Sequence, residues 1–176
     1  MSPPPEPALA PIAHDQFVAD VAALAEAIMA DGWRPDHLVG IGRGGLVPGA
    51  YLSHRTGIPL LSLDLSAGVP AFAEALVAEL ARLTRAGSRL LLVDDINDSG
   101  GTLAGLSAAL ASEGAESARV RVAVLIDNRR SPARVDYRAR TIDRAADKRW
   151  FVFPWEAMAP RETLIAESEA VPARLR

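Results

Sequence analysis

The clearest chemical signal in the sequence is the string Val93-Asp94-Asp95-Ile96-Asn97-Asp98-Ser99-Gly100-Gly101-Thr102. An apolar run ends there in two adjacent acids, and a third acid, Asp98, opens a turn of small and hydroxyl-bearing residues. Glycines let backbone N–H groups approach an anion closely, and a following helix N-terminus adds partial positive charge, so Asp98 to Thr102 favour a phosphate. The acids need other partners, which sugar hydroxyls or a divalent cation would supply. The string therefore predicts a sugar-phosphate site; the alternative is a helix N-terminus capped by Asp98 or Ser99.

A second string, Gly42-Arg43-Gly44-Gly45, also joins an apolar segment to a helical pattern. Arg43 carries a planar guanidinium group that suits bidentate contact with a phosphate. Taken alone, a glycine-rich turn with one arginine favours a tight strand-to-helix connection with a surface arginine.

A third segment is rich in aromatic residues, which make up only 5% of the chain. It holds Trp150, Phe151, Phe153 and Trp155. A flat ring beside a ligand pocket can stack on a nucleobase. The alternative is an edge strand whose aromatic side chains fill the core, and we favour that alternative for Phe153 and Trp155.

Strands and helices alternate along the chain that must position these strings. The run Leu90-Leu91-Leu92-Val93 suits a strand buried on both faces of a parallel sheet. The alternation implies an α/β fold with a mostly parallel sheet flanked by helices, and ligands of such sheets bind beyond the carboxyl ends of the strands. Apolar runs predict strands at 37–41, 58–63, 89–93, 120–126 and 149–153, and apolar spacings of three and four predict helices through 17–28, about 47–55, 71–85 and 103–110.

The length of 176 residues suits one domain. Residues 1–11 hold five prolines and no periodic apolar pattern, so we expect a disordered or extended tail there. The expected folded domain covers residues 12–156, and residues 157–176 are an expected C-terminal tail. No internal repeat and no second domain is evident.

Composition excludes several classes of protein. The formal net charge of -3 argues against a protein that binds nucleic acid through bulk charge, and the absence of cysteine excludes disulfides and thiolate metal sites. No apolar run approaches the roughly 20 residues that span a bilayer, and the N-terminus lacks the basic start of a signal peptide. We therefore expect a cytoplasmic protein without nucleic-acid or membrane partners.

The first string resembles the phosphoribosyl-pyrophosphate (PRPP) motif of the type I phosphoribosyltransferases. The resemblance implies the fold of that family for residues 12–156. It also implies that Asp94 and Asp95 contact the ribose hydroxyls and bind a Mg ion. Asp98 would lie near the purine N7 and accept or relay the base proton. Asp98, Ser99, Gly100, Gly101 and Thr102 would then wrap the 5′-phosphate.

The other two strings are similar to segments of the bacterial xanthine-guanine and hypoxanthine enzymes. Arg43 to Gly49 resembles their pyrophosphate loop, which implies that Gly42, Arg43, Gly44 and Gly45 bind pyrophosphate, with a strained and often cis peptide near Gly42-Arg43. Residues 150–156 are similar to the Trp-x-x-x-Pro-Trp-acid segment of a small C-terminal hood over the purine, and we call these residues the hood. By that match Trp150 stacks on the base, and the backbone of Phe151 meets its edge.

The sequence departs from the family in two places. Asp127 stands where 6-oxopurine enzymes carry a lysine that contacts the purine O6. Asn128 or Arg129 could replace that donor, Asp127 could select another base, or Asp127 could be only a turn residue. The family also carries a mobile flap, often a β-hairpin, between positions 65 and 89; here Gly68-Val69-Pro70 would be a stub of it, and a helical pattern follows.

The resemblance implies a Mg-dependent purine phosphoribosyltransferase that uses PRPP and a nucleobase and forms a homodimer or homotetramer. The main alternative is a PRPP- or nucleotide-sensing protein of the same fold without useful turnover. A third hypothesis is a phosphoacceptor of the haloacid-dehalogenase or response-regulator type that uses Asp94 or Asp95. It requires a lysine near a strand end, and the late Lys148 is the chain's single lysine.

Overall fold

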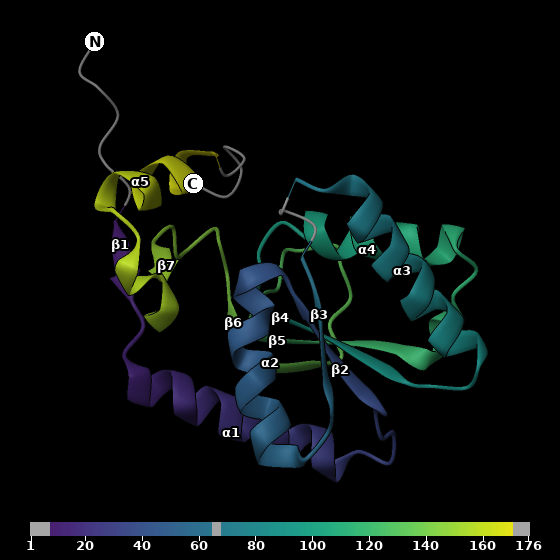
Figure 1. The fold of residues 1–176 in the computed structure, drawn as a ribbon. Coiled ribbons are helices and arrows are strands. Elements are labelled where there is room, and N and C mark those ends of the chain that lie inside the picture. The colour runs from purple at the N-terminus through teal and green to yellow at the C-terminus, as the bar shows by residue number, and fades with distance from the viewer. Residues whose placement is uncertain (1–7, 65–67, 171–176) are drawn as a thin grey trace.

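The computed structural model describes residues 8–64 and 68–170. Its core is a five-stranded sheet in the order β3-β2-β4-β5-β6, and all four strand pairs are parallel (Figure 1). The predicted α/β fold with a mostly parallel sheet is therefore confirmed. The strands are β2 (His37–Ile41), β3 (Leu60–Leu63), β4 (Leu90–Asn97), β5 (Val120–Asn128) and β6 (Tyr137–Ile142).

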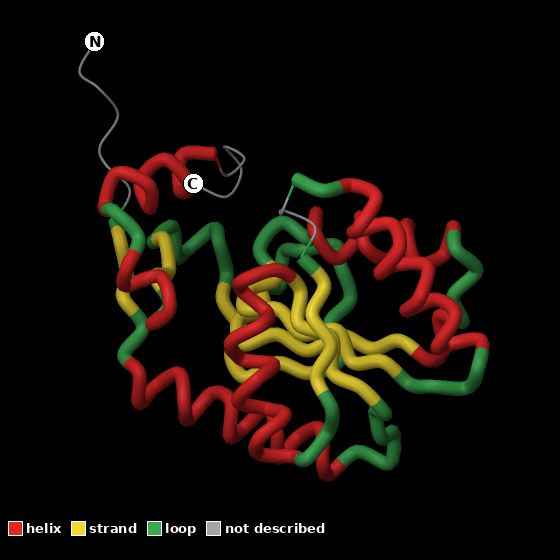
Figure 2. The backbone as a smooth tube through the Cα atoms, viewed as in Figure 1, coloured by secondary structure: helices red, strands yellow, loops and turns green. Residues whose placement is uncertain are grey.

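Helices cover both faces of this sheet (Figure 2). Four helices connect or precede the strands, together with a short 3-10 turn before β5. They are α1 (His14–Ala30), α2 (Gly42–Thr56), α3 (Pro70–Arg85), α4 (Gly101–Ser112) and η1 (Ser117–Arg119).

Strand β4 shows why the sheet needs two covering layers. Its residues 90–93 are all 0% exposed. Leu91 and Val93 belong to the core cluster that contains α1, whereas Leu90 and Leu92 belong to the cluster that contains α3 and α4. Because side chains alternate along a strand, an unbroken apolar run buries both faces.

A small second sheet and a terminal helix complete the described chain. Strand β1 (Leu9–Pro11) pairs in parallel with β7 (Trp150–Val152), and β7 leads into the 3-10 helix η2 (Pro154–Met158) and then α5 (Arg161–Ala170). In Figure 1 these elements gather on one side of the five-stranded sheet.

The two expected tails end differently in the structure. Residues 9–11 form a strand because the hood supplies a partner for them, and residues 161–170 form a helix whose Leu164 is buried. The described end of the expected tail at 1–11 is therefore extended and paired, and the expected tail at 157–176 contains a helix. Residues 1–7 and 171–176 lie outside the described part of the chain.

Two elements, α2 and β6, differ from expectation, whereas α3 agrees with the helix predicted through 71–85. Helix α2 begins at Gly42, so the predicted glycine-rich loop is the first turn of a helix. Strand β6 was not predicted, because charged residues such as Arg138 and Arg140 interrupt its apolar pattern at the edge of the sheet. In the described residues between β3 and β4 there is a helix and no hairpin, and residues 65–67 of the expected flap region are not described.

Among the described helices none combines the length and the apolar character needed to cross a bilayer.

Candidate functional site

A cleft of about 750 Å³ lies at the carboxyl ends of β2, β3 and β4. Both predicted phosphate strings line it, so the fold brings them together although they are about 50 residues apart in the chain. Sequence analysis did not single out Asp64 or Glu167, which also line it. The predicted residues in its wall are Gly42, Arg43, Gly44, Asp94, Asp95, Asp98, Ser99, Gly100, Gly101 and Thr102.

The turn after β4 has the conformation that a phosphate loop needs. Gly100 adopts a φ of +81°, and a Cβ at that position would lie 2.6 Å from the Ser131 hydroxyl. Both observations favour glycine there. Helix α4 begins at the next residue, Gly101, so its first backbone N–H groups lie in the cleft wall. The partial positive charge of that helix N-terminus suits an anion.

The first turn of α2 packs directly against the end of β4. A Cβ on Gly45 would lie 1.9 Å from the carbonyl oxygen of Val93, and one on Gly44 would lie 2.6 Å from a carboxylate oxygen of Asp95. These two glycines therefore allow a close approach of helix to strand, besides any contact with a ligand. Arg43 projects from the same turn and lines the cleft. The peptide near Gly42-Arg43, which the resemblance implied is often cis, is trans, since the described residues contain no cis peptide.

The adjacent acids at the end of β4 lie in a strongly anionic setting. Burial raises the pKa of Asp94 well above its usual value, and the charge of Asp95 raises it further. Burial also raises the pKa of Asp95 to about 7, and the charge of Glu156 in the hood adds to this effect. Two carboxylates side by side, one buried and one half-buried, resist ionisation together. A cation or a hydrogen-bond donor from a ligand would relieve that cost.

The donor set fits Mg²⁺ on chemical grounds. Mg²⁺ prefers oxygen ligands and commonly binds through one or two carboxylates, with substrate phosphates and water completing the shell. Asp94 and Asp95 offer two carboxylates in the wall of the cleft. The described residues contain no group of three or more acids, histidines or cysteines arranged to hold a metal.

Asp98 is held by an arginine that sequence analysis missed. The Arg144 Nε donates to both carboxylate oxygens of Asp98, at 2.9 and 3.1 Å, and Nη2 donates to Oδ2 at 2.7 Å. The Arg144 side chain is 4% exposed and the Asp98 side chain is 17% exposed. Such a two-point charged pair fixes the orientation of the carboxylate.

Asp127 does not line the cleft. Asp127 is 7% exposed. Asn97 Nδ2 donates to its Oδ1 at 2.8 Å, and Arg138 Nε lies 3.4 Å from its Oδ2. Both carboxylate oxygens are therefore engaged by protein groups. Asp127 thus ties β5 to Asn97 at the end of β4 and to Arg138 in β6, and a contact of Asp127 with a base stays a prediction.

The two predicted aromatic base contacts lie in the hood strand, outside the cleft wall. Trp150 is partly buried, and its backbone N–H donates to the carbonyl of Ala8 at 2.8 Å. Its indole Nε1 is buried without a hydrogen-bond partner. Phe151 is buried in the core cluster that contains α1. The roles of Trp150 and Phe151 toward a base stay predictions.

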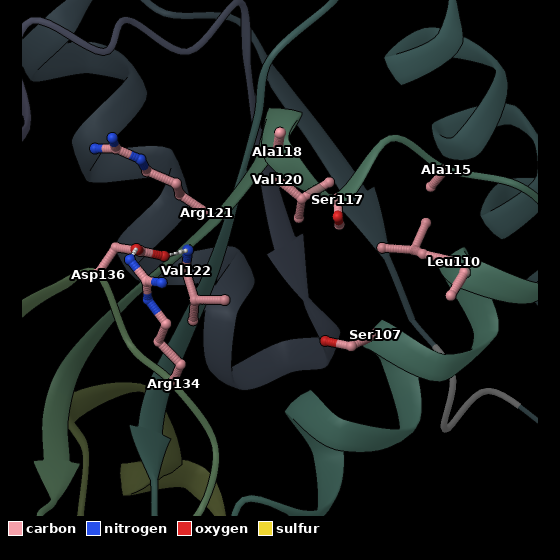
Figure 3. Close-up of a pocket in the computed structure, with 11 residues that line it drawn as sticks. Ser107, Leu110, Ala115, Ser117, Ala118, Val120, Arg121, Val122, Arg134 and Asp136 are labelled. Carbon is pink, nitrogen blue, oxygen red and sulfur yellow. Dashed lines mark hydrogen bonds and ion pairs between the residues drawn. The ribbon is translucent and has the colours of Figure 1, made fainter.

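A second cavity, of about 540 Å³, lies at the amino end of β5 (Figure 3). Leu110, Val120 and Val122 supply apolar lining, and the Arg134–Asp136 ion pair lies beside Val122, whose backbone N–H donates to Asp136. It shares no lining residue with the cleft. Since parallel sheets place ligands at the carboxyl ends of their strands, the cleft is the candidate active site.

Residues 12–159 match the family model described as the phosphoribosyl transferase domain. The chain belongs to this family. The enzyme class predicted from the first string, phosphoribosyltransferase, is thereby confirmed, and the phosphoacceptor hypothesis is discarded.

Solved structures agree with the family. A purine phosphoribosyltransferase from Pyrococcus horikoshii is 26% identical, with a TM-score of 0.64 over 86% of this chain and 97% of that one. The xanthine-guanine-hypoxanthine phosphoribosyltransferase of Helicobacter pylori is 19% identical, with a TM-score of 0.62 over 85% and 94%. A hypothetical protein from Neisseria gonorrhoeae with bound ppGpp is 22% identical, with a TM-score of 0.66 over 93% and 98%. The last two show the fold alone.

Proposed function

We propose that this phosphoribosyltransferase is a Mg-dependent purine enzyme that exchanges the pyrophosphate of PRPP for a nucleobase and releases a nucleoside 5′-monophosphate. One observation carries the proposal: the first turns of α2 and α4 line a single cleft together with the Asp94–Asp95 pair. The similarity to the Pyrococcus horikoshii purine enzyme supports a purine as the acceptor.

Different residues of the cleft bind different parts of PRPP. The backbone N–H groups from Ser99 to Thr102 bind the 5′-phosphate, and Arg43 with the first turn of α2 binds the pyrophosphate end. Asp94 and Asp95 orient the ribose through its hydroxyls and hold a divalent cation with the substrate. Mg²⁺, when bound, neutralises charge on the departing pyrophosphate.

The base would lie between Asp98 and the hood. Asp98 accepts a hydrogen bond or proton from the base as the new bond to ribose forms. Trp150 stacks on the ring and holds its plane, and the Phe151 backbone meets its edge. Because a carboxylate only accepts hydrogen bonds, the donor to a purine O6 would be a group other than Asp127.

Direct turnover tests this function. The protein is incubated with Mg-PRPP and a mixture of purine and pyrimidine bases, and products are identified by mass spectrometry alongside pyrophosphate release. We expect a purine nucleoside monophosphate from the wild type, strong loss of product in Asp95→Asn, and wild-type yield in Asp15→Asn, whose carboxylate is fully exposed on α1. Hydrolysis of PRPP without nucleotide, or no reaction with any base, would contradict the proposal.

A nucleotide-sensing role is the second candidate function. The helix α3 stands where the family's flap was expected, which favours a slower enzyme or a binding protein, because exclusion of water protects a reactive ribose. The Neisseria gonorrhoeae protein carries ppGpp. Saturable binding of PRPP or a guanosine polyphosphate without pyrophosphate release would support this candidate.

Our proposal also includes a homodimer or homotetramer located in the cytoplasm. Sedimentation equilibrium of the purified chain tests the assembly, and a monomer at micromolar concentration would contradict it. Fractionation of the source cells tests the location.

A further inference from the structure

Arg144 lies in the turn between β6 and β7, and it acts on the cleft only through another residue. It does not line the cleft, whereas its partner Asp98 does. The two positions are 46 residues apart in the chain. Three donor contacts of 2.7 to 3.1 Å fix both oxygens of Asp98, so the carboxylate cannot rotate freely.

The Nη1 atom of the same guanidinium binds the backbone of the segment that leads into the hood. Arg144 Nη1 donates to the backbone carbonyl oxygens of Asp147 and Arg149, and the latter residue directly precedes β7. The guanidinium carbon lies 5.0 Å from the centroid of the Phe151 ring in β7. One side chain thus joins the phosphate loop to the hood strand.

Asn128 also links Asp98 and Arg144, through hydrogen bonds to the backbone of both residues. Asn128 Nδ2 donates to the backbone carbonyl of Asp98 at 2.9 Å, and Asn128 Oδ1 accepts from the backbone N–H of Arg144 at 3.3 Å. The carboxylate and the main chain of Asp98 are therefore both tied to the same turn. This makes the spacing between Asp98 and β7 a property of the folded protein before any ligand binds.

A role in stability alone explains this arrangement poorly. A buried ion pair often contributes no more stability than apolar residues of similar volume, because both charges lose their hydration. Only a planar guanidinium has enough donors, in the right directions, to hold a carboxylate and two carbonyls at once. The arrangement is suited to fixing geometry.

We propose that Arg144 is a positioning residue that fixes the gap between Asp98 and the hood strand, and so sets the slot for the base. The inference rests on the proposed function, which places the base between these two parts. Arg144 meets the loop after β4 through Asp98, and among the described residues it shares no hydrogen bond or ion pair with Arg43, Ser99 or Thr102. Base use should therefore depend on Arg144 much more than PRPP binding does.

The test is the split between two kinetic constants in Arg144→Lys. Lysine keeps the charge but cannot hold the carboxylate and both carbonyls together. We expect kcat/KM for the base to fall about 10- to 100-fold, the usual range for loss of a residue that orients a functional group, while KM for PRPP changes less than about twofold. The matched control is Arg149→Lys, which also faces the Phe151 ring but pairs with Asp147, and it should resemble the wild type.

Each outcome decides the matter. If KM for PRPP rises in step with the fall in kcat/KM for the base, Arg144 has a general structural role and the inference is overturned. An unchanged kcat/KM for the base would also overturn it. If Arg144→Lys fails to fold, Arg144→Gln takes its place, and failure of both to fold would also overturn it. If the wild type makes no nucleotide from any base, the proposed function itself fails; if the wild type is active and Arg144→Lys equals it, only the role of Arg144 fails.

Discussion

Gly45 in the first turn of α2 lies so close to the carbonyl oxygen of Val93 that a Cβ on the glycine would come within 1.9 Å of it. This contact sets α2 against the end of β4 and thereby brings Arg43 to the acid pair. The glycine string at 42–45 is thus explained by packing as well as by its predicted affinity for pyrophosphate. The two explanations can be separated by measuring stability without ligand.

Gly45→Ala should lower the free energy of unfolding by about 1–3 kcal/mol, the usual cost of overpacking a close contact. Urea unfolding of the ligand-free protein measures this. The matched control is Gly105→Ala in α4, where a Cβ would meet nothing within 4 Å. That change should stabilise the protein by about 0.5–1 kcal/mol, because alanine is the better helix former. Equal stability of Gly45→Ala and wild type would contradict the packing account.

Asp98→Asn should reduce stability as well as activity. The substitution leaves the Arg144 guanidinium, 4% exposed, without its counter-charge. Breaking a buried ion pair from one side costs about 3–5 kcal/mol, and we expect the lower end because Asp98 itself is 17% exposed. Urea unfolding checks the change, with Glu79→Gln as the control for an exposed pair on α3. A purely catalytic Asp98 would give loss of turnover at wild-type stability, contrary to our expectation.

Asp95→Asn should stabilise the ligand-free protein at alkaline pH while abolishing nucleotide formation. The pKa of Asp95 is about 7 in the folded protein, against an ordinary 3.8. Between these values the folded protein keeps a proton that the unfolded chain has released. The free energy of unfolding therefore falls as the pH rises, and the full destabilisation by ionised Asp95 is present above about pH 7.

The comparison is therefore made at two pH values. The variant should unfold with nearly the wild-type free energy at about pH 4, and should be more stable by a few kcal/mol at about pH 8. Asp15→Asn provides the exposed control. The same difference between Asp95→Asn and wild type at both pH values would show that burial does not raise this pKa.

Asp127→Asn should leave base choice unchanged. Its carboxylate faces Asn97 and Arg138, so the ratio of kcat/KM for guanine to that for adenine should stay within about twofold of wild type. Steady-state kinetics with both bases measures the ratio. A larger shift in favour of either base would place Asp127 against the base after all.

Sequence reasoning reached the fold and most of the cleft because both depend on local patterns. An unbroken run such as residues 90–93 identifies a strand buried on two faces, and acids directly after it fall at its carboxyl end. Asp64 follows a predicted strand in the same way, so the same rule could have found it.

The parts that were missed depend on contacts distant in sequence. Nothing near Arg144 indicates that it meets Asp98 across 46 residues, and Glu167 reaches the cleft only through the packing of α5. Strand β6 was hidden because an edge strand tolerates charged residues such as Arg138 and Arg140. The partner of Asp127, Asn97 on the neighbouring strand, is likewise 30 residues away in the chain and could not be read from the sequence around Asp127.

A crystal structure of the protein with Mg²⁺ and PRPP tests the central claim most directly. We expect the 5′-phosphate on the backbone N–H groups of Ser99 to Thr102, the pyrophosphate beside Arg43, and the ribose hydroxyls against Asp94 and Asp95. Density for PRPP in the cavity at the amino end of β5, or an empty cleft at saturating ligand, would contradict the account.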